Sequence, residues 1–163
     1  GHANVLASST NPTLPYGANA VAEHLDMILL CHGMNPGNDS DVRIARSRVR
    51  GVTTAAEGRL HDLGVIGVTS SDAQGMGRAG ETVRRTFQLA AVSKPADDDS
   101  PHDNARVLRY LAKLTINPAL AHGLSHEVGS LQPGRMADVV LWSPATFGAT
   151  SSVPMKAAIT TGH

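Results

Sequence analysis

The sequence predicts an α/β fold, because segments with helical periodicity alternate with two short apolar runs typical of buried strands. Along the chain, a group of helices precedes each of the two strands. Sixteen glycines and nine prolines among 163 residues indicate many turns. Aromatic residues make up only 3% of the chain, although large aromatic side chains usually contribute heavily to a core. We therefore expect a thin core that packs against further chain.

The spacing of apolar residues predicts the helices. Residues 21–32 are expected to be a helix that Asn19 is placed to cap. The side chains that share its face at i, i+3, i+4 and i+7 are Leu25, Ile28, Leu29 and His32. A helix from Thr53 or Thr54 to Leu63 would bury Ala56, Leu60 and Leu63 on one face. Further helices are expected over residues 41–50, 81–92, 105–115 and 117–122.

Two apolar runs predict the strands. The run 65–69 is bounded by Gly64 and Ser70, which is typical of a buried strand, and residues 137–142 form the second. Asn4-Val5-Leu6 could add a short strand, whereas residues 8–17 are expected to be a loop. Polar or glycine-rich loops are expected at 75–80, 93–104 and 129–134.

Composition excludes several classes of protein. Fourteen Lys and Arg residues balance 14 Asp and Glu residues, which argues against nucleic-acid binding by bulk charge and against a polybasic membrane binder. No stretch approaches the roughly 18 apolar residues of a membrane span, and no signal-peptide pattern is visible. The single cysteine, Cys31, excludes an intrachain disulfide framework and fits a cytoplasmic location.

Asp72 and the pair Cys31-His32 are the first candidate site residues. Asp72 follows the predicted strand 65–69, and the carboxyl ends of barrel strands carry active sites, where a carboxylate suits a metal or a general base. An Asp at this position also caps turns. Cys31-His32 ends a predicted helix. A nucleophilic Cys needs a base across space rather than beside it in sequence, so a small buried Cys and a His interacting with the helix dipole are the favoured explanation of the pair. Both interpretations stay open for each candidate.

The segment Gly75–Gly80 fits G-x-G-x-x-G, the fingerprint of dinucleotide binding. That fingerprint also needs a second strand ending in an acidic residue about 20 residues further on. The acidic residues 97–99 instead lie in a polar loop. A plain turn from strand to helix is therefore favoured over a nucleotide-binding module.

A set of motifs runs through nearly the whole chain: NVL at 4–6, SSTNPTLPY at 8–16, EHLDM at 23–27 leading to Cys31-His32, SRVR at 47–50, SSDAQGMGR at 70–78, residues 106–110, and TINPA at 115–119 followed by Gly129-Ser130, Ala137-Asp138 and Trp142. In order and spacing these motifs resemble the urease α (catalytic) subunit. The last group alone would indicate only the wider metal-dependent amidohydrolases.

The resemblance implies the C-terminal part of a (β/α)₈ amidohydrolase barrel with the return into the accompanying β domain. Residues 1–128 would form late barrel units, including an active-site flap over about 21–50, and residues 129–163 would begin the return. It also implies nickel-dependent hydrolysis of urea to ammonia and carbamate in the complete enzyme, with urease β and γ subunits as partners in a homo-oligomer of heteromers. A metal-bound hydroxide would attack urea near neutral pH.

Site residues are carried over from the resemblance one by one. Asp72 matches the aspartate ligand of one nickel, and His32 matches the flap histidine that donates a proton. Cys31 matches the flap cysteine that helps to position that histidine. Arg48 matches the arginine that orients substrate and flap. The remaining metal ligands of the family would precede residue 1, so we expect the isolated chain to be inactive.

The chain departs from the family pattern at several positions. Gly33 stands where a second histidine is usual, Arg46 where an acidic residue is usual, and the loop 93–104 is short. Gly75 replaces an alanine, and this substitution alone creates the G-x-G-x-x-G pattern. A non-catalytic amidohydrolase relative or an assembly piece therefore remains the alternative.

Overall fold

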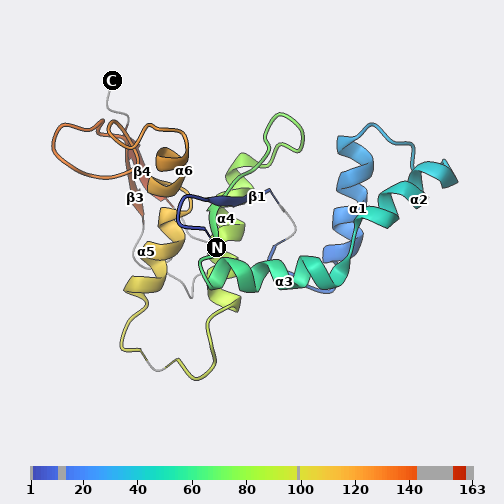
Figure 1. Ribbon diagram of the computed structural model, residues 1–163, viewed down its shortest axis with the longest axis horizontal. Coiled ribbons are helices and arrows are strands. Elements are labelled where there is room, and N and C mark those ends of the chain that lie inside the picture. Colours follow the sequence, from blue (N-terminus) through green and yellow to red (C-terminus); the bar gives the residue numbers. More distant parts are fainter. Residues whose placement is uncertain (1, 11–13, 99, 143–155, 161–163) are drawn as a thin grey trace.

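The computed structural model describes residues 2–10, 14–98 and 100–142, and the backbone of a strand at 156–160. Its elements are β1 (Ala7–Ser9), α1 (Ala20–Cys31), α2 (Asp39–Arg48), α3 (Gly51–Asp62), β2 (Ile66–Thr69), α4 (Ala79–Val92), α5 (Asn104–Ala112), α6 (Ile116–Ala121), β3 (Val139–Trp142) and β4 (Lys156–Thr160). Figure 1 shows α1 and α2 at one end of an elongated molecule and the β3–β4 pair at the other. The strand β1 and the helix α4 lie between these ends.

The strands β1 and β2 form a parallel pair, with Ser9 opposite Thr69. The buried strand predicted over 65–69 is confirmed as β2, in which Ile66 and Val68 are buried. The strand expected at Asn4-Val5-Leu6 is wrong, because β1 begins at Ala7 and takes Ser8 and Ser9 from the expected loop. Pairing with β2 selects these residues, and the buried Ser9 hydroxyl donates a hydrogen bond to Glu57 of α3.

The second edge of β2 is held by the segment around α6. Thr69 N donates to the Lys113 carbonyl oxygen at 3.2 Å, and Asn117 Nδ2 donates to the Gly67 carbonyl oxygen at 2.8 Å. The buried Lys113 ammonium donates to the carbonyl oxygen of Ile66. These contacts satisfy backbone groups that a further strand would otherwise bind. They fix the strand that leads to Asp72.

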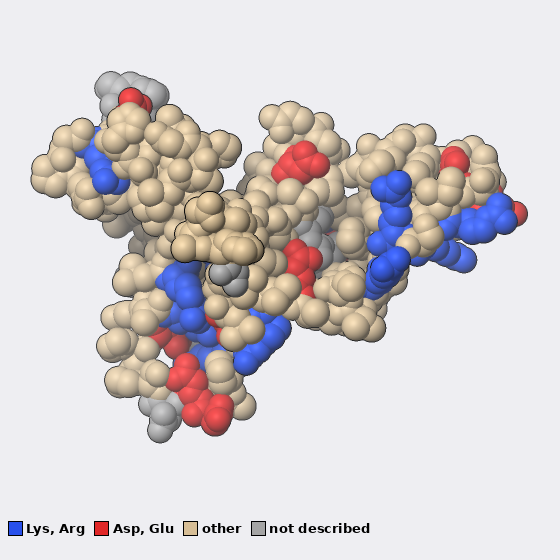
Figure 2. Space-filling view, viewed as in Figure 1, with Lys and Arg blue, Asp and Glu red and all other residues tan. Residues whose placement is uncertain are grey.

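The buried core joins α4 to α5 through Leu14, Phe87, Leu89, Ala90 and Tyr110. It is small, as the low aromatic content predicts. Figure 2 shows basic side chains gathered over α2 and acidic ones on the loop between α4 and α5. Among the described residues, no helix has the length and apolar character needed to cross a membrane.

The face that α3 buries differs from the prediction. Leu60 and Leu63 are exposed, whereas His61 and Asp62 are buried. Asp62 forms a buried salt bridge with Arg106 and accepts a 3.1 Å hydrogen bond from Tyr110 Oη. Partners on α5 therefore decide which face of α3 turns inward.

The other predicted helices are present with shifted ends. Helix α1 confirms the prediction over 21–32, but the Asn19 side chain makes no capping hydrogen bond. Helix α2 confirms the helix expected at 41–50, and α4 and α6 confirm those at 81–92 and 117–122. Helix α5 ends at Ala112 rather than at residue 115. The strand β3 pairs antiparallel with β4 in a separate sheet.

Candidate active site

Asp72 lies on the loop that leaves the carboxyl end of β2. Its carbonyl oxygen accepts hydrogen bonds from Gly75 N at 3.0 Å and Met76 N at 2.7 Å, so residues 72–76 form a tight turn. Its φ of 49° is left-handed, a conformation that Asp tolerates better than most residues. The carboxylate is exposed, and a Cβ at position 75 would lie 3.0 Å from its Oδ2 atom. Gly75 therefore leaves this carboxylate room to move.

Cys31 and His32 lie at the C-terminal end of α1. Gly33 has a φ of 60°, Gly33 N donates to the Leu30 carbonyl oxygen, and Met34 N donates to that of Leu29 at 2.9 Å. This is a helix end of the Schellman type, which favours glycine at the left-handed position. The left-handed φ at this helix end therefore favours Gly33 over the histidine of the urease pattern.

The ring of His32 is exposed, and its Nδ1 atom lies 3.1 Å from the Ile28 carbonyl oxygen. A carbonyl oxygen only accepts hydrogen bonds, so Nδ1 carries the hydrogen of this contact. The Nε2 atom is then the ring position left to take up and give away a proton. The free thiol of Cys31 is half-buried one residue earlier, on the last turn of α1.

Arg48 is exposed at the last residue of α2, two residues after Arg46. The turn before α2 is tied to that helix, because Asn35 N donates to Asp41 Oδ2 at 2.9 Å. The Asn38 side chain caps the helix by accepting from Ser40 N. Figure 1 shows α1 and α2 side by side at one end of the molecule, and they pack against each other. His32 and Arg48 thus belong to one helical pair.

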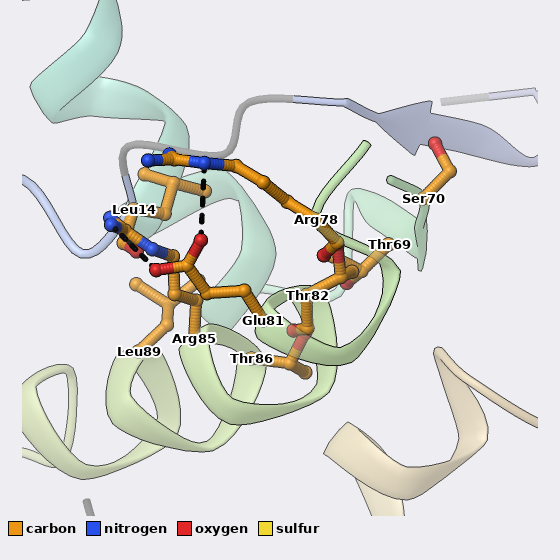
Figure 3. A pocket seen from close by; sticks show the side chains of 9 residues that line it. All are labelled: Leu14, Thr69, Ser70, Arg78, Glu81, Thr82, Arg85, Thr86 and Leu89. Atoms are coloured by element: carbon orange, nitrogen blue, oxygen red, sulfur yellow. Dashed lines mark hydrogen bonds and ion pairs between the residues drawn. The ribbon is translucent and has the colours of Figure 1, made fainter. Parts of the chain in front are cut away.

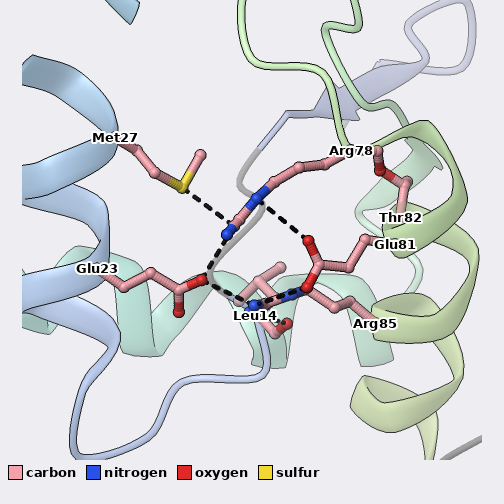
Figure 4. Close-up of polar contacts among 7 residues, drawn as sticks. All are labelled: Leu14, Glu23, Met27, Arg78, Glu81, Thr82 and Arg85. Atoms are coloured by element: carbon pink, nitrogen blue, oxygen red, sulfur yellow. Dashed lines mark hydrogen bonds and ion pairs between the residues drawn. The ribbon is translucent and has the colours of Figure 1, made fainter. Parts of the chain in front are cut away.

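Four charged side chains connect α1 to α4. Arg78 Nη1 lies 2.9 Å from Glu23 Oε1, and Arg85 Nη2 lies 2.8 Å from the same oxygen (Figure 4). Glu81 contacts both arginines, at 3.1 Å from Arg78 Nε and 3.3 Å from Arg85 Nη2. Burial raises the pKa of Glu23, but the hydrogen bond from Arg78 and the charges of the two arginines outweigh it and hold the pKa below its ordinary value. We call these four residues the Glu23 network.

A small pocket lies beside the Glu23 network, between Thr69 and Ser70 on one side and α4 on the other (Figure 3). Its volume of about 10 Å³ leaves room for about one water molecule. A larger apolar groove of about 820 Å³ runs between α5, α6 and β3. None of the predicted site residues lines either of them.

The structure does not bring the predicted site residues into direct contact. Within the described ranges, no hydrogen bond or ion pair joins Asp72 to Cys31, His32 or Arg48. No group of three or more His, Cys, Asp or Glu side chains able to hold a metal occurs there either. The exposed Asp72 carboxylate fits one metal ligand, and a complete metal site needs ligands from elsewhere.

Within the segment Gly75–Gly80, residues 75–78 lead out of a turn, and Ala79 and Gly80 begin α4. Glu81 stands in the first turn of that helix, so a negative charge already occupies the place where a nucleotide phosphate would bind. This favours the plain turn over a nucleotide-binding module. One local signal pointed to the Glu23 network, the spacing of Glu81 and Arg85 at i, i+4. Nothing local pointed to Glu23, which lies 55 residues from Arg78.

Comparison with known proteins identifies one family and two similar proteins. The amidohydrolase family matches residues 1–163. The chain is 62% identical over 158 residues to urease subunit alpha 1 of Streptomyces avermitilis, covering 96% of this chain and 28% of that protein. It is 59% identical over 159 residues to urease subunit alpha 2 of Streptomyces coelicolor, with 96% and 28% covered. The chain therefore spans about 28% of the length of these curated relatives.

Proposed function

Because the chain belongs to the amidohydrolase family, we propose that it is part of the catalytic subunit of a urease, which hydrolyses urea to ammonia and carbamate. The observation that carries this proposal is the identity of 62% and 59% to two urease α subunits over 96% of the chain. The exposed carboxylate of Asp72 after the strand β2 supports it, because this is where a barrel enzyme holds its metal.

The proposal includes a position within a (β/α)₈ barrel. The parallel neighbours β1 and β2, joined through helices, have the arrangement of consecutive barrel strands. Residues 1–128 would form late barrel units with a flap over about 21–50. Residues 129–163 would begin the return to a β domain, which the separate β3–β4 sheet supports.

Nickel is the metal proposed, and Asp72 is the residue of this chain that would hold it. A bound metal supplies a Lewis acid and a water of lowered pKa. The carboxylate of Asp72 is exposed, and among the described residues it has no hydrogen-bond partner, so it could meet ligands from other parts of the subunit. Its oxygen ligand suits a hard or borderline divalent cation.

His32 is proposed as the proton donor to the departing amine. The Ile28 carbonyl oxygen holds its Nδ1 hydrogen, so a protonated ring would deliver the proton from Nε2. Cys31 on the same helical turn would help to orient the ring, and Arg48 would orient substrate and flap from the end of α2. Urease β and γ subunits are the proposed partners, and a cytoplasmic location is part of the same proposal.

The test is urea hydrolysis by the full-length subunit, assembled with its partner chains and loaded with nickel. We expect one ammonia and one carbamate per urea, followed by a second ammonia when the carbamate decomposes in solution. In Asp72→Ala we expect loss of both activity and bound metal. An assembly that holds metal but releases no ammonia from urea would favour the non-catalytic relative instead.

A further inference from the structure

We propose that Arg78 is a positioning residue that ties the loop carrying Asp72 to the helix carrying Cys31 and His32, through Glu23. The proposal rests on the proposed urease function for its consequence in catalysis. The tie itself stands on contacts within this chain, so it can be tested separately.

Arg78 stands at the junction of the Asp72 loop and α4. Its φ of 64° is left-handed, as is that of Asp72, and these are the non-glycine residues with positive φ in the described part of the chain. Such a conformation is uncommon for a long side chain and persists where surrounding contacts hold it. The Arg78 carbonyl oxygen accepts hydrogen bonds from Thr82 N at 3.0 Å and Thr82 Oγ1 at 3.2 Å, and the Arg78 guanidinium reaches across to α1 (Figure 4). The backbone of the site loop and the side-chain tie therefore depend on one residue.

The tie has two anchor points on α1. Arg78 Nη1 donates to Glu23 Oε1 at 2.9 Å and contacts the sulfur of the buried Met27 at 3.3 Å. Glu23 and Met27 are one helical turn apart, so the guanidinium grips one face of α1. Within the described ranges, Arg78 and Arg85 make every side-chain hydrogen bond that joins α1 to α4.

The charges of the Glu23 network make the tie stronger than a single surface pair. Two arginines meet one carboxylate oxygen of Glu23, and Glu81 lies between them with both of its oxygens engaged. Two positive and two negative charges cancel, which allows the side chains to be only 20–32% exposed. Isolated exposed ion pairs contribute little, whereas a network with shared partners holds its geometry better.

The position of the His32 ring depends on the orientation of α1, because His32 lies far along this helix from Glu23. His32 lies nine residues beyond Glu23, which corresponds to roughly 13 Å along α1 at about 1.5 Å per residue. A tilt of α1 at its Glu23 end would therefore move the His32 ring by an ångström or more. Misplacement of about 1 Å can lower a rate on the order of 100-fold. The network thus sets where the proton donor stands relative to the Asp72 loop.

The experiment compares Arg78→Gly, Arg78→Lys and Glu23→Gln in the full-length assembly. Glycine accepts the left-handed φ without strain, so Arg78→Gly removes the tie and leaves the turn able to form. Arg84→Gln and Asp26→Asn are matched controls, because both side chains are exposed on the same two helices outside the network. The readouts are amide hydrogen exchange of residues 20–34, kcat and KM for urea, and nickel content.

We expect faster exchange across α1 in Arg78→Gly and in Glu23→Gln, with the double variant no worse than the poorer single variant. The value of kcat should fall about 10- to 100-fold, while KM changes less and nickel content stays that of the parent. Arg78→Lys should recover part of kcat, and both controls should match the parent.

If amide hydrogen exchange of α1 in Arg78→Gly equals that of the parent, Arg78 does not tie the Asp72 loop to α1, whatever the activity of the variant. Fast exchange with an unchanged kcat would overturn the positioning role. If the parent assembly releases no ammonia from urea, the proposed function fails, while the exchange measurement still decides whether the tie exists.

Discussion

The Nδ1 atom of His32 lies 3.1 Å from the carbonyl oxygen of Ile28, one turn earlier on α1. This contact uses one ring nitrogen for structure and leaves Nε2 for chemistry. The contact also fixes the ring to the end of α1, so the orientation of this helix sets the orientation of the proposed proton donor.

His32→Ala in the full-length enzyme should lower kcat by on the order of 10²- to 10⁴-fold, the usual contribution of general acid catalysis. Proton donation is needed in the transition state, so KM should change far less and nickel content should stay constant. Steady-state kinetics and metal analysis on one preparation check this, with Cys31→Ala as a milder comparison. A kcat within a few-fold of the parent, or loss of nickel, would contradict the assignment.

Asp72→Ala in the full-length enzyme should lower nickel content and activity together. Among the described residues no hydrogen bond reaches the exposed carboxylate, so the fold should survive the change. Ala fits the left-handed φ of 49° less well than Asp, and we expect a small loss of stability. Metal analysis and thermal unfolding of the same sample separate loss of metal from loss of stability.

In the isolated chain of 163 residues, calorimetry should find no pair of tightly bound nickel ions, and two such ions per chain would refute this.

Gly33→His restores the residue usual in the urease pattern but should destabilise the end of α1. The φ of 60° at this position costs a residue with a Cβ about 1–2 kcal/mol. Hydrogen exchange of the Met34 amide, which closes the helix end, should report faster local opening. Gly33→Asn is the control, because Asn tolerates the left-handed region and should show a smaller effect. Equal exchange in Gly33→His and the parent would show that the turn adapts.

His61 should make the chain less stable as the pH falls from about 6.5 to 4. Its ring is fully buried, and within the described ranges neither ring nitrogen has a hydrogen-bond partner. Burial, with a smaller effect from Lys113, lowers the pKa of His61 to about 4. Over this interval the unfolded chain binds the proton and the folded chain does not. The stability present above pH 6.5 is therefore lost on acidification, by on the order of 3 kcal/mol.

Guanidinium unfolding at several pH values checks the role of His61, and guanidinium replaces urea here because urea is the proposed substrate. His61→Gln removes the titrating group, so the slope of unfolding free energy against pH should be smaller between pH 4 and 6.5. Identical slopes in the variant and the parent would show that other groups govern the acid sensitivity.

The helices and the strand β2 could be predicted because their signals are local. Apolar spacing and a closing glycine define α1, and the run between Gly64 and Ser70 defines β2 with Asp72 just beyond it. Asp72, Cys31 and His32 could be named as candidates for the same reason, whereas Arg48 was named only through the resemblance of its motif to urease. Their roles in catalysis are part of the proposed function.

The tertiary structure decided what depends on distant partners. The strand β1 starts at Ala7 because β2 offers it a parallel edge, and α3 buries Asp62 instead of Leu60 because Arg106 and Tyr110 lie opposite. The tie between Arg78 and Glu23 crosses 55 residues of sequence. Hydrogen bonds and ion pairs of this kind form only when folding brings their partners together, so no local pattern along the chain contains them.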